Sequence, residues 1–216
     1  MLSALIFDLD GLIADTERLH YQAYRQALSE MGVDLCESDY GEHWVRWGKG
    51  IAEWVATHGL ALDSHALRQR KAQHYLDLLG SSLRPMEGAL EVLAGFHRQM
   101  RMALASSSYR DAIDGVLAGL KIADFFEVIV SGLDVRRVKP EPDLFLKAAR
   151  DLGVEPAQCL VLEDAEKGVL AAHRAGMRCI AVPNDYTRHH DFSAATTICS
   201  SLKEITPELI ERLGTR

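Results

Sequence analysis

The chain has 216 residues, of which 48% are hydrophobic and 25% are charged, a composition typical of a globular protein with a sizeable core. Its formal net charge of -7 argues against nucleic acid as the main partner, although a small anionic substrate remains compatible with it. No apolar stretch is long enough to cross a membrane, and the first residues lack the pattern of a signal peptide. We therefore expect a cytoplasmic monomer with no membrane partner.

The four cysteines contain no C-x-x-C pair. Cys159 and Cys179 lie inside apolar, strand-like runs, whereas Cys36 and Cys199 have no distinctive context. We expect buried free thiols in a reducing cytosol.

The first apolar run, residues 2–7, ends abruptly in the sequence DLDG. A short aliphatic run that gives way to polar residues and glycine predicts a buried strand opening into a loop. Residues 16–31 then predict a helix, because small and apolar residues repeat on one face and Gly32 is placed to stop it.

A second helix is expected from Asp63, a good N-cap, to Leu79, with Gly80 closing it. Between the two helices, residues 33–62 contain all three tryptophans and no convincing strand. The whole stretch from 16 to 80 is therefore expected to be helical.

After Pro85 the pattern changes to helix-like segments that alternate with short apolar runs, which begin near residues 102, 126, 159 and 179. This alternation is typical of βαβ units and of a parallel sheet. We predict an α/β fold with a Rossmann-like parallel sheet, formed by residues 1–15 and 82–216. Residues 16–81 form a helical domain inserted after the first strand, and the tail from residue 206 forms a last capped helix.

Polar side chains follow several predicted strands, at the ends where parallel sheets collect ligands. Magnesium prefers oxygen ligands, and a lysine can neutralise phosphoryl oxygens. One carboxylate beside the metal can attack phosphorus, while a second can protonate the leaving group and then activate water. The inventory at the strand ends, which predicts a site for a divalent cation and a phosphoryl group, is Asp8, Asp10, Ser106, Ser107, Ser108, Lys139, Glu163 and Asp164.

Each of these residues has a simpler interpretation when it is taken alone. An aspartate after a strand is often only a helix N-cap or a turn residue, and Lys139 alone would most often be a solvated surface lysine. A serine triplet is most often a cap or a turn. The combination of all of them, each at a strand end, favours the catalytic interpretation.

The segments DLDGLIADT, LASSS, KPEPD and LED closely resemble, in order and spacing, the four motifs of the haloacid dehalogenase superfamily. Within it, the chain resembles the branch of small sugar-phosphate phosphatases and β-phosphoglucomutase. The resemblance covers nearly the whole chain, including the inserted helical domain, residues 16–81, which we call the cap. It implies a magnesium-dependent phosphomonoesterase that acts on a small phosphorylated metabolite, such as a sugar phosphate, through an aspartyl-phosphate intermediate.

The resemblance also implies a role for each matched residue. Asp8 is expected to be the nucleophile and a magnesium ligand. Asp10 is expected to be the general acid and base, with its backbone carbonyl on magnesium. Ser106, Ser107 and Lys139 are expected to hold the phosphoryl group, and Lys139 also neutralises the surroundings of the nucleophile.

The last motif is expected to complete the metal site. Asp164 would bind magnesium, and Glu163 would either bind it as well or support the ligands that do. Gly11 belongs to the flexible turn that lets the cap open and close. The family often has serine after the magnesium-binding aspartate, and Ala165 takes that place here, which removes a polar contact but no ligand.

The cap is expected to close over the site, exclude water and choose the leaving group. Gly48 and Gly50 interrupt a helical pattern of aromatic and aliphatic residues around Lys49. Lys49 is therefore either a substrate contact on a loop that faces the catalytic aspartates or a solvated lysine beside an aromatic core.

His20 is also open to two interpretations. It is either a structural histidine on a helix or, as its position resembles one in β-phosphoglucomutase, a neighbour of the acid–base aspartate. Thr16 falls at the hinge and can hydrogen-bond Asp10. The pair His189 and His190 matches no metal-ligand pattern and is expected at the surface.

The nearest rival function is a mutase of the β-phosphoglucomutase type, which must hold a second phosphate at the cap. The mutase pattern there resembles K-G-x-x-R, whereas this chain has Glu53 in the place of the arginine. That change removes a bidentate phosphate clamp and introduces a like charge. Tyr109 also replaces a lysine that follows the serine motif in the mutases. We therefore predict a hydrolase.

Two further alternatives fit the sequence less well. Dehalogenases of this superfamily lack the second aspartate and need no metal, whereas Asp10 is present here. Non-catalytic phosphometabolite-binding proteins on the same scaffold usually lose catalytic positions, and none of the core set is missing from this chain.

Overall fold

The computed structural model describes residues 1–215. Its core is a parallel sheet of six strands in the order β3-β2-β1-β4-β5-β6. Five strands correspond to the predicted apolar runs, whereas β6 was not predicted because it is a two-residue strand at the edge of the sheet. The strands are β1 (Ala4–Phe7), β2 (Arg101–Ala105), β3 (Val128–Val130), β4 (Cys159–Glu163), β5 (Arg178–Ala181) and β6 (Thr197–Ile198).

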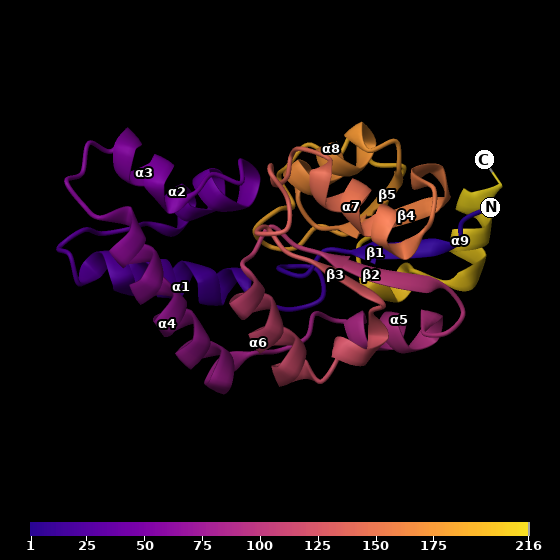
Figure 1. The fold of residues 1–216 in the computed structure, drawn as a ribbon, viewed down its shortest axis with the longest axis horizontal. Helices are drawn as coiled ribbons and strands as arrows, with labels where there is room; N and C mark the ends of the chain where they lie inside the picture. Colours follow the sequence, from indigo (N-terminus) through magenta and orange to yellow (C-terminus); the bar gives the residue numbers. More distant parts are fainter. Residues whose placement is uncertain (216) are drawn as a thin grey trace.

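Helices cover both faces of the sheet (Figure 1). One apolar core joins alternate residues of β1, such as Leu5 and Phe7, to α5 (Ala89–Phe96), α6 (Arg110–Leu120) and α9 (Pro207–Gly214). The other joins Ala4 and Ile6 to α7 (Asp143–Leu152) and α8 (Glu166–Arg174). Burial on both faces explains why the strands read as continuous apolar runs rather than as alternating ones. Short 3₁₀ turns occur at η2 (Ala123–Phe125), η3 (Pro156–Gln158) and η4 (Leu202–Glu204).

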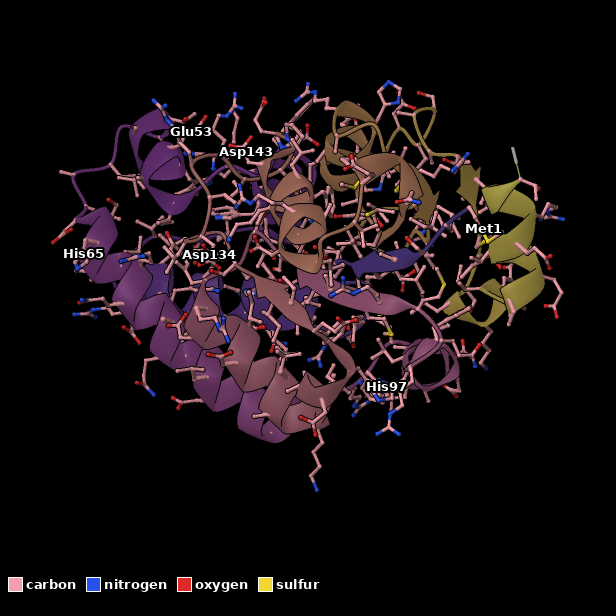
Figure 2. The ribbon with its side chains drawn as sticks, turned by 45° about the vertical axis from the view of Figure 1, so that its right-hand side comes forward. Met1, Glu53, His65, His97, Asp134 and Asp143 are labelled. Carbon is pink, nitrogen blue, oxygen red and sulfur yellow. The ribbon has the colours of Figure 1, made fainter. Side chains whose placement is uncertain are left out.

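The segment predicted as the cap is helical and has an aromatic-rich core of its own. Figure 2 shows Glu53 and His65 in this segment, at the opposite end of the molecule from Met1. The helices are α1 (Glu17–Ser29), α2 (Glu37–Tyr40), the π-helical η1 (Gly41–Arg46), α3 (Ile51–Thr57) and α4 (Ser64–Ser82). The predicted α/β fold class is thus confirmed, while the boundaries between core and cap stay our own interpretation.

The ends of the cap helices differ in part from the prediction. Asp63 caps α4 as expected, because its side chain accepts hydrogen bonds from the backbone of His65 and Ala66 at 2.9 and 3.3 Å. The prediction that Gly80 closes this helix was wrong, since α4 continues to Ser82. A glycine ends a helix where it takes the left-handed conformation, and Gly80 is not among the residues with positive φ.

Two predictions about burial also need correction. Cys36 is exposed because it precedes the short helix α2 at the cap surface, whereas the other three cysteines are buried free thiols. His190 is buried, unlike its exposed neighbour His189, because its loop packs against the start of α8, where its Nδ1 lies 3.4 Å from the amide nitrogen of Glu166. Within residues 1–215, no helix is both long enough and apolar enough to span a bilayer.

Candidate active site

A cavity of about 740 Å³ lies between the carboxyl ends of the central strands and the cap, and its size is that of a small-molecule site. Strand β1 pairs with β2 on one side and β4 on the other, so the loop after β1 opens at the centre of the sheet edge. Every site residue named from the sequence lines this cavity, namely Asp8, Asp10, His20, Lys49, Ser106, Ser107, Lys139, Glu163 and Asp164.

Lys139 is buried between two carboxylates. Its Nζ donates a hydrogen bond to Asp8 Oδ1 and another, 2.7 Å long, to Glu163 Oε1. Burial acts against the charged form of the amine, but the charges of Asp8 and Glu163 raise the pKa of Lys139 above its ordinary value. The lysine is therefore a fixed positive charge beside the candidate nucleophile.

Asp8, Glu163 and Asp164 form a buried cluster whose carboxylate oxygens lie within 4.8 Å of one another. Glu163 has both oxygens engaged, because Oε1 accepts from Lys139 and Oε2 accepts from the backbone N–H groups of Asp164 and Ala165 at 2.9 and 3.0 Å. Glu163 is thus placed to support the cluster, and Asp8 and Asp164 are the carboxylates better placed to reach a metal.

The charge of this cluster fits a divalent cation. Burial raises the pKa of Asp8 to about 8 despite the neighbouring Lys139, and burial together with the other carboxylates raises the pKa of Asp164 well above its ordinary value. The imbalance arises because Asp8 and Glu163 share Lys139, whereas Asp164 has no ion-pair partner within residues 1–215. A bound divalent cation would supply the missing positive charge through the hard oxygen ligands that magnesium prefers.

Asn184 completes the cluster and was not predicted. Its Nδ2 donates to Asp164 Oδ2 at 2.8 Å and to the backbone carbonyl of Gly11 at 3.0 Å. The same strand-end rule that located the other residues could have located it, because Asn184 lies just beyond the end of β5.

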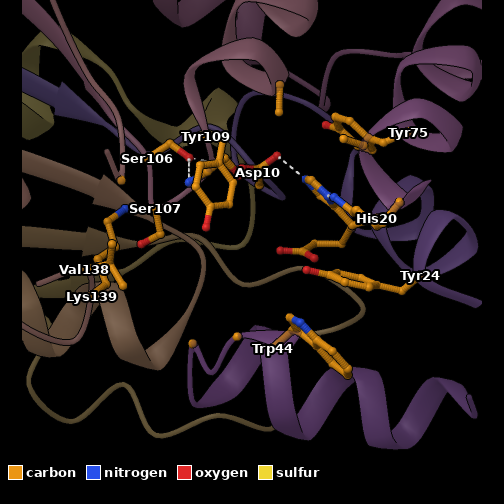
Figure 3. Close-up of a pocket in the computed structure, with 18 of the residues that line it drawn as sticks. Asp10, His20, Tyr24, Trp44, Tyr75, Ser106, Ser107, Tyr109, Val138 and Lys139 are labelled. Atoms are coloured by element: carbon orange, nitrogen blue, oxygen red, sulfur yellow. Dashed lines mark hydrogen bonds and ion pairs between the residues drawn. The ribbon is translucent and has the colours of Figure 1, made fainter. Parts of the chain in front are cut away.

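Asp10 lies between the core and the cap, and both its oxygens accept hydrogen bonds (Figure 3). Oδ1 accepts from Thr16 Oγ1 at 2.7 Å and from His20 Nε2 at 3.0 Å. Oδ2 accepts from Ser106 Oγ at 3.2 Å and from Ser108 Oγ at 2.7 Å. Burial acts to raise the pKa of Asp10, but His20 and the hydroxyl donors outweigh it and hold the pKa below its ordinary value. The hydrogen bond expected from Thr16 is present, and the donors around Asp10 favour its ionised form.

His20 connects Asp10 to the second long helix of the cap. Lys71 Nζ, on α4, lies 2.6 Å from His20 Nδ1, and with the protonated lysine as donor the ring proton would reside on Nε2 and face Asp10. The ring also stacks on Tyr75 with a centroid distance of 4.0 Å. No local motif marks Lys71, because only the packing of α4 on α1 brings it to a residue 51 positions earlier in the chain.

The three serines of the motif Ser106–Ser108 have two different roles. Ser106 was expected to hold the phosphoryl group and Ser108 was named only as part of the strand-end inventory, but both donate to Asp10. Ser107 Oγ is buried and has no hydrogen-bond partner among the described residues. Because unpaired buried hydroxyl groups are costly, Ser107 is the serine best placed to bind a phosphoryl oxygen.

Lys49 lies at the cavity wall but is not a free cation. Its Nζ pairs with Glu53 at 3.1 Å, and the two side chains are 45% and 52% exposed. Lys49 lies on the loop before α3 and Glu53 lies in the first turn of that helix, so their i,i+4 spacing brings the two side chains together. The glutamate thus offsets the charge of the lysine that the sequence singled out.

Gly11 turns the chain directly beside the carboxylate cluster, with φ at +79°. A Cβ at this position would lie 2.6 Å from Asp164 Oδ2 and 2.7 Å from Asn184 Nδ2. We expect Gly11→Ala to displace Asp164, to lower kcat/KM at least about 100-fold and to destabilise the fold by about 1–2 kcal/mol. Gly32→Ala is the matched control, because φ there is +73° but a Cβ would meet nothing within 4 Å. Equal activities of the two variants, measured on an aryl phosphate, would contradict this account of Gly11.

Comparisons with known proteins place this chain in a family. The sequence profile of the haloacid dehalogenase-like hydrolases matches residues 5–182. The chain belongs to this family. It is 33% identical to protein CbbY of Rhodobacter capsulatus, over 98% of this chain and 99% of that one. It is also 33% identical to the fructose-1-phosphate phosphatase YqaB of Escherichia coli, over 83% of this chain and 96% of that one.

Solved structures agree with the sequence matches. A β-phosphoglucomutase structure from Clostridium difficile superposes with a TM-score of 0.85 at 26% identity, covering 100% of this chain and 98% of that one. The predicted branch of phosphatases and β-phosphoglucomutases is therefore confirmed, and the relatives support the predicted enzyme class, a phosphatase.

Proposed function

We propose that the chain is a magnesium-dependent phosphatase of small phosphorylated sugars that forms an aspartyl phosphate on Asp8. The observation that carries the proposal is the arrangement around Asp8. Lys139 holds one oxygen of this carboxylate, and Asp164 lies within reach of the same cation site. Asp10, the second carboxylate, lies nearby with its own donors. The named relatives of this chain include a fructose-1-phosphate phosphatase, which supports a sugar phosphate as substrate.

In the first half of the reaction, Asp8 attacks phosphorus and displaces the sugar oxygen. Magnesium, which the carboxylates of Asp8 and Asp164 and the backbone carbonyl of Asp10 would hold, would neutralise charge on the phosphoryl oxygens. Lys139 orients Asp8 and, with Ser107, holds further phosphoryl oxygens. The approach of an anionic substrate favours the protonated form of Asp10, which then donates its proton to the leaving oxygen.

In the second half, water attacks phosphorus and regenerates Asp8. Asp10 is ionised once it has donated its proton, and its hydrogen bonds from His20, Thr16 and Ser108 favour that form. The carboxylate can therefore accept a proton from the attacking water. The result is free phosphate and a dephosphorylated sugar.

Hydrolysis of the aspartyl phosphate is favoured over transfer of the phosphoryl group back to the sugar. The reason is that the cap lacks the arginine with which a mutase of this branch is expected to hold a second phosphate. Glu53 pairs with Lys49 and offers no donor to a phosphate. A cap that releases the sugar admits water to phosphorylated Asp8, whereas a mutase must keep water out until its intermediate has reoriented.

The proposal predicts a strict metal requirement. We expect the protein to release phosphate from p-nitrophenyl phosphate with magnesium and to lose at least about 1000-fold in rate after complete chelation. Calcium is expected to inhibit, because it accepts more ligands in a looser geometry and misaligns the carboxylate of Asp8. Full activity in metal-free protein would refute the metal site.

The choice between hydrolase and mutase is tested with β-glucose 1-phosphate, magnesium and a trace of glucose 1,6-bisphosphate. The proposed phosphatase releases inorganic phosphate from sugar phosphates at a rate that exceeds isomerisation. Glucose 6-phosphate forming much faster than inorganic phosphate would overturn the hydrolase and favour the mutase.

A further inference from the structure

The cap contacts the core at two places, on α6 and on α8, which cover opposite faces of the sheet (Figure 1). At the first place, α4 packs against α6 with a leucine seated on a glycine. A Cβ at Gly115 of α6 would lie only 3.0 Å from Leu79 Cδ1 of α4. Between the same helices, Arg68 stacks on Tyr109 with its Cζ 4.7 Å from the ring centroid. This contact is close and largely apolar.

The second contact, at the first turn of α8, is made by charged side chains. Lys167 Nζ donates to the backbone carbonyl of Trp44 at 2.8 Å. Arg46 Nε donates to Glu166 Oε2 at 3.1 Å, and these two side chains are 30% and 12% exposed. In both pairs one partner belongs to the cap and the other to the core. We call these two pairs the latch.

The position of Lys167 is unfavourable within its own helix. It lies in the first turn of α8, where the helix dipole disfavours a positive charge. Its acceptor is a carbonyl in the last turn of η1, and the carboxyl end of a helix favours a cation. Lys167 therefore caps a helix of the cap domain from the core, although 123 positions in the sequence separate it from Trp44.

The turn after η1 lies so close to the core that it requires a glycine. Gly48 has φ at +65°, and a Cβ there would lie 2.9 Å from the backbone carbonyl oxygen of Lys139 and 3.2 Å from Lys167 Cδ. The cap thus touches both the latch lysine and the backbone of the lysine that binds Asp8.

The two contacts should respond differently when the cap moves. Separating α4 from α6 would expose apolar surface and lose close packing. The polar groups of the latch can exchange their partners for water at little net cost. The cap is therefore expected to open at α8 and to pivot at α6.

We propose that the latch sets the equilibrium between the open and closed cap, and that Lys167 is a positioning residue that acts through Trp44. Trp44 is buried and lines the cavity, and Figure 3 shows it on the cap side with Lys139 on the core side. When the latch forms, the Trp44 ring closes the cavity over the leaving group and excludes water. The latch itself rests on geometry, whereas its effect on the rate rests on the proposed function.

The first test measures the position of the cap by pulsed electron paramagnetic resonance. One spin label is attached to Cys36, which is exposed in the cap, and one to Glu155→Cys, which is exposed before β4 in the core. We expect one distance to dominate while the latch is intact. Lys167→Met should shift the closed-to-open ratio about tenfold toward the open form, and Arg46→Gln about threefold. Lys167→Arg should recover part of the loss, because it keeps a charged donor.

The second test compares two substrates. Lys167→Met should lower kcat/KM about tenfold for fructose 1-phosphate, whose leaving oxygen needs the closed site and a proton from Asp10. For p-nitrophenyl phosphate, whose leaving group departs without a proton, the loss should be at most about threefold. Arg174→Gln is the control on the same helix, because its Nη1 contacts only core groups, the carbonyl of Pro140 at 2.9 Å and Glu141 at 3.2 Å. It should change neither the distances nor the rates.

A glycine pair separates the contact with the core from backbone strain. Gly48→Ala should open the cap, because the added Cβ collides with the core. Gly59→Ala is the matched control in the cap, since φ there is +62° but a Cβ would meet nothing within 4 Å. It should leave the distance distribution unchanged.

Three results would overturn the proposal. The first is a distance distribution that Lys167→Met leaves unchanged, and the second is an opening by Gly59→Ala as large as that by Gly48→Ala. The third, an equal loss of kcat/KM on both substrates, would refute the positioning role of Lys167. The distances are measured without substrate, so failure to hydrolyse any phosphate ester would refute the proposed function while the latch is still judged by the distances. The two failures are therefore distinguishable.

Discussion

Asp8→Asn is expected to abolish turnover, with a loss of about 10⁴-fold or more in kcat. The amide of asparagine is a poor nucleophile and a weaker ligand for a hard cation than a carboxylate. The substitution keeps the size of the side chain in a buried position, and it removes one of three clustered negative charges, so the fold should persist. Steady-state release of phosphate from p-nitrophenyl phosphate measures the effect, with circular dichroism to verify folding.

Asp185→Asn provides the matched control for this variant. The Asp185 side chain is 93% exposed, so the same chemical change there should leave turnover at the wild-type rate. Near-native activity of a folded Asp8→Asn protein would refute the assignment of Asp8 as the nucleophile.

Lys139→Met is expected to cost both activity and stability. Removing the amine leaves the buried carboxylates of Asp8 and Glu163 without their cation, which should lower the free energy of unfolding by about 3–5 kcal/mol. Turnover should fall at least about 1000-fold, because the nucleophile loses its orienting charge and the phosphoryl group loses a donor. Urea unfolding in metal-free buffer measures the first effect, and phosphate release with magnesium measures the second.

Two comparisons separate these effects. The double variant Lys139→Met/Glu163→Gln should regain part of the stability, since it removes one unpaired charge, but none of the activity. Lys147→Met removes a lysine from a helix-surface pair with Asp151 and should change stability by less than about 1 kcal/mol. If Lys139→Met were as stable as Lys147→Met, the buried lysine would not be the counter-ion of the carboxylate cluster.

The candidate catalytic residues that follow the strands were predictable because their positions depend on local sequence. Each apolar run ends where the parallel sheet gathers ligands, so Asp8, Lys139 and Asp164 could be placed together before the sheet order was known. The same rule applied to the end of β5 would have added Asn184.

The cap side of the site was less predictable because it depends on how α4 packs on α1. Lys71 reaches His20 only through that packing, and Arg68 reaches Tyr109 only through the packing of α4 against α6. Neither residue carries a local motif. The pairing of Lys49 with Glu53 follows from their i,i+4 spacing and was predictable. The sequence pattern drew attention instead to the mutase arginine that Glu53 replaces. Tertiary packing therefore decides which cations remain free to bind a substrate.

Trapping the covalent intermediate tests the central claim most directly. The protein is mixed with magnesium and p-nitrophenyl phosphate, quenched during the first turnover and treated with borohydride, which reduces an acyl phosphate to an alcohol. Mass spectrometry of the peptide that contains Asp8 should then show homoserine at that position and unmodified aspartate at Asp10. Full phosphate release with an unmodified Asp8, or reduction at another carboxylate, would contradict catalysis through an aspartyl phosphate on Asp8.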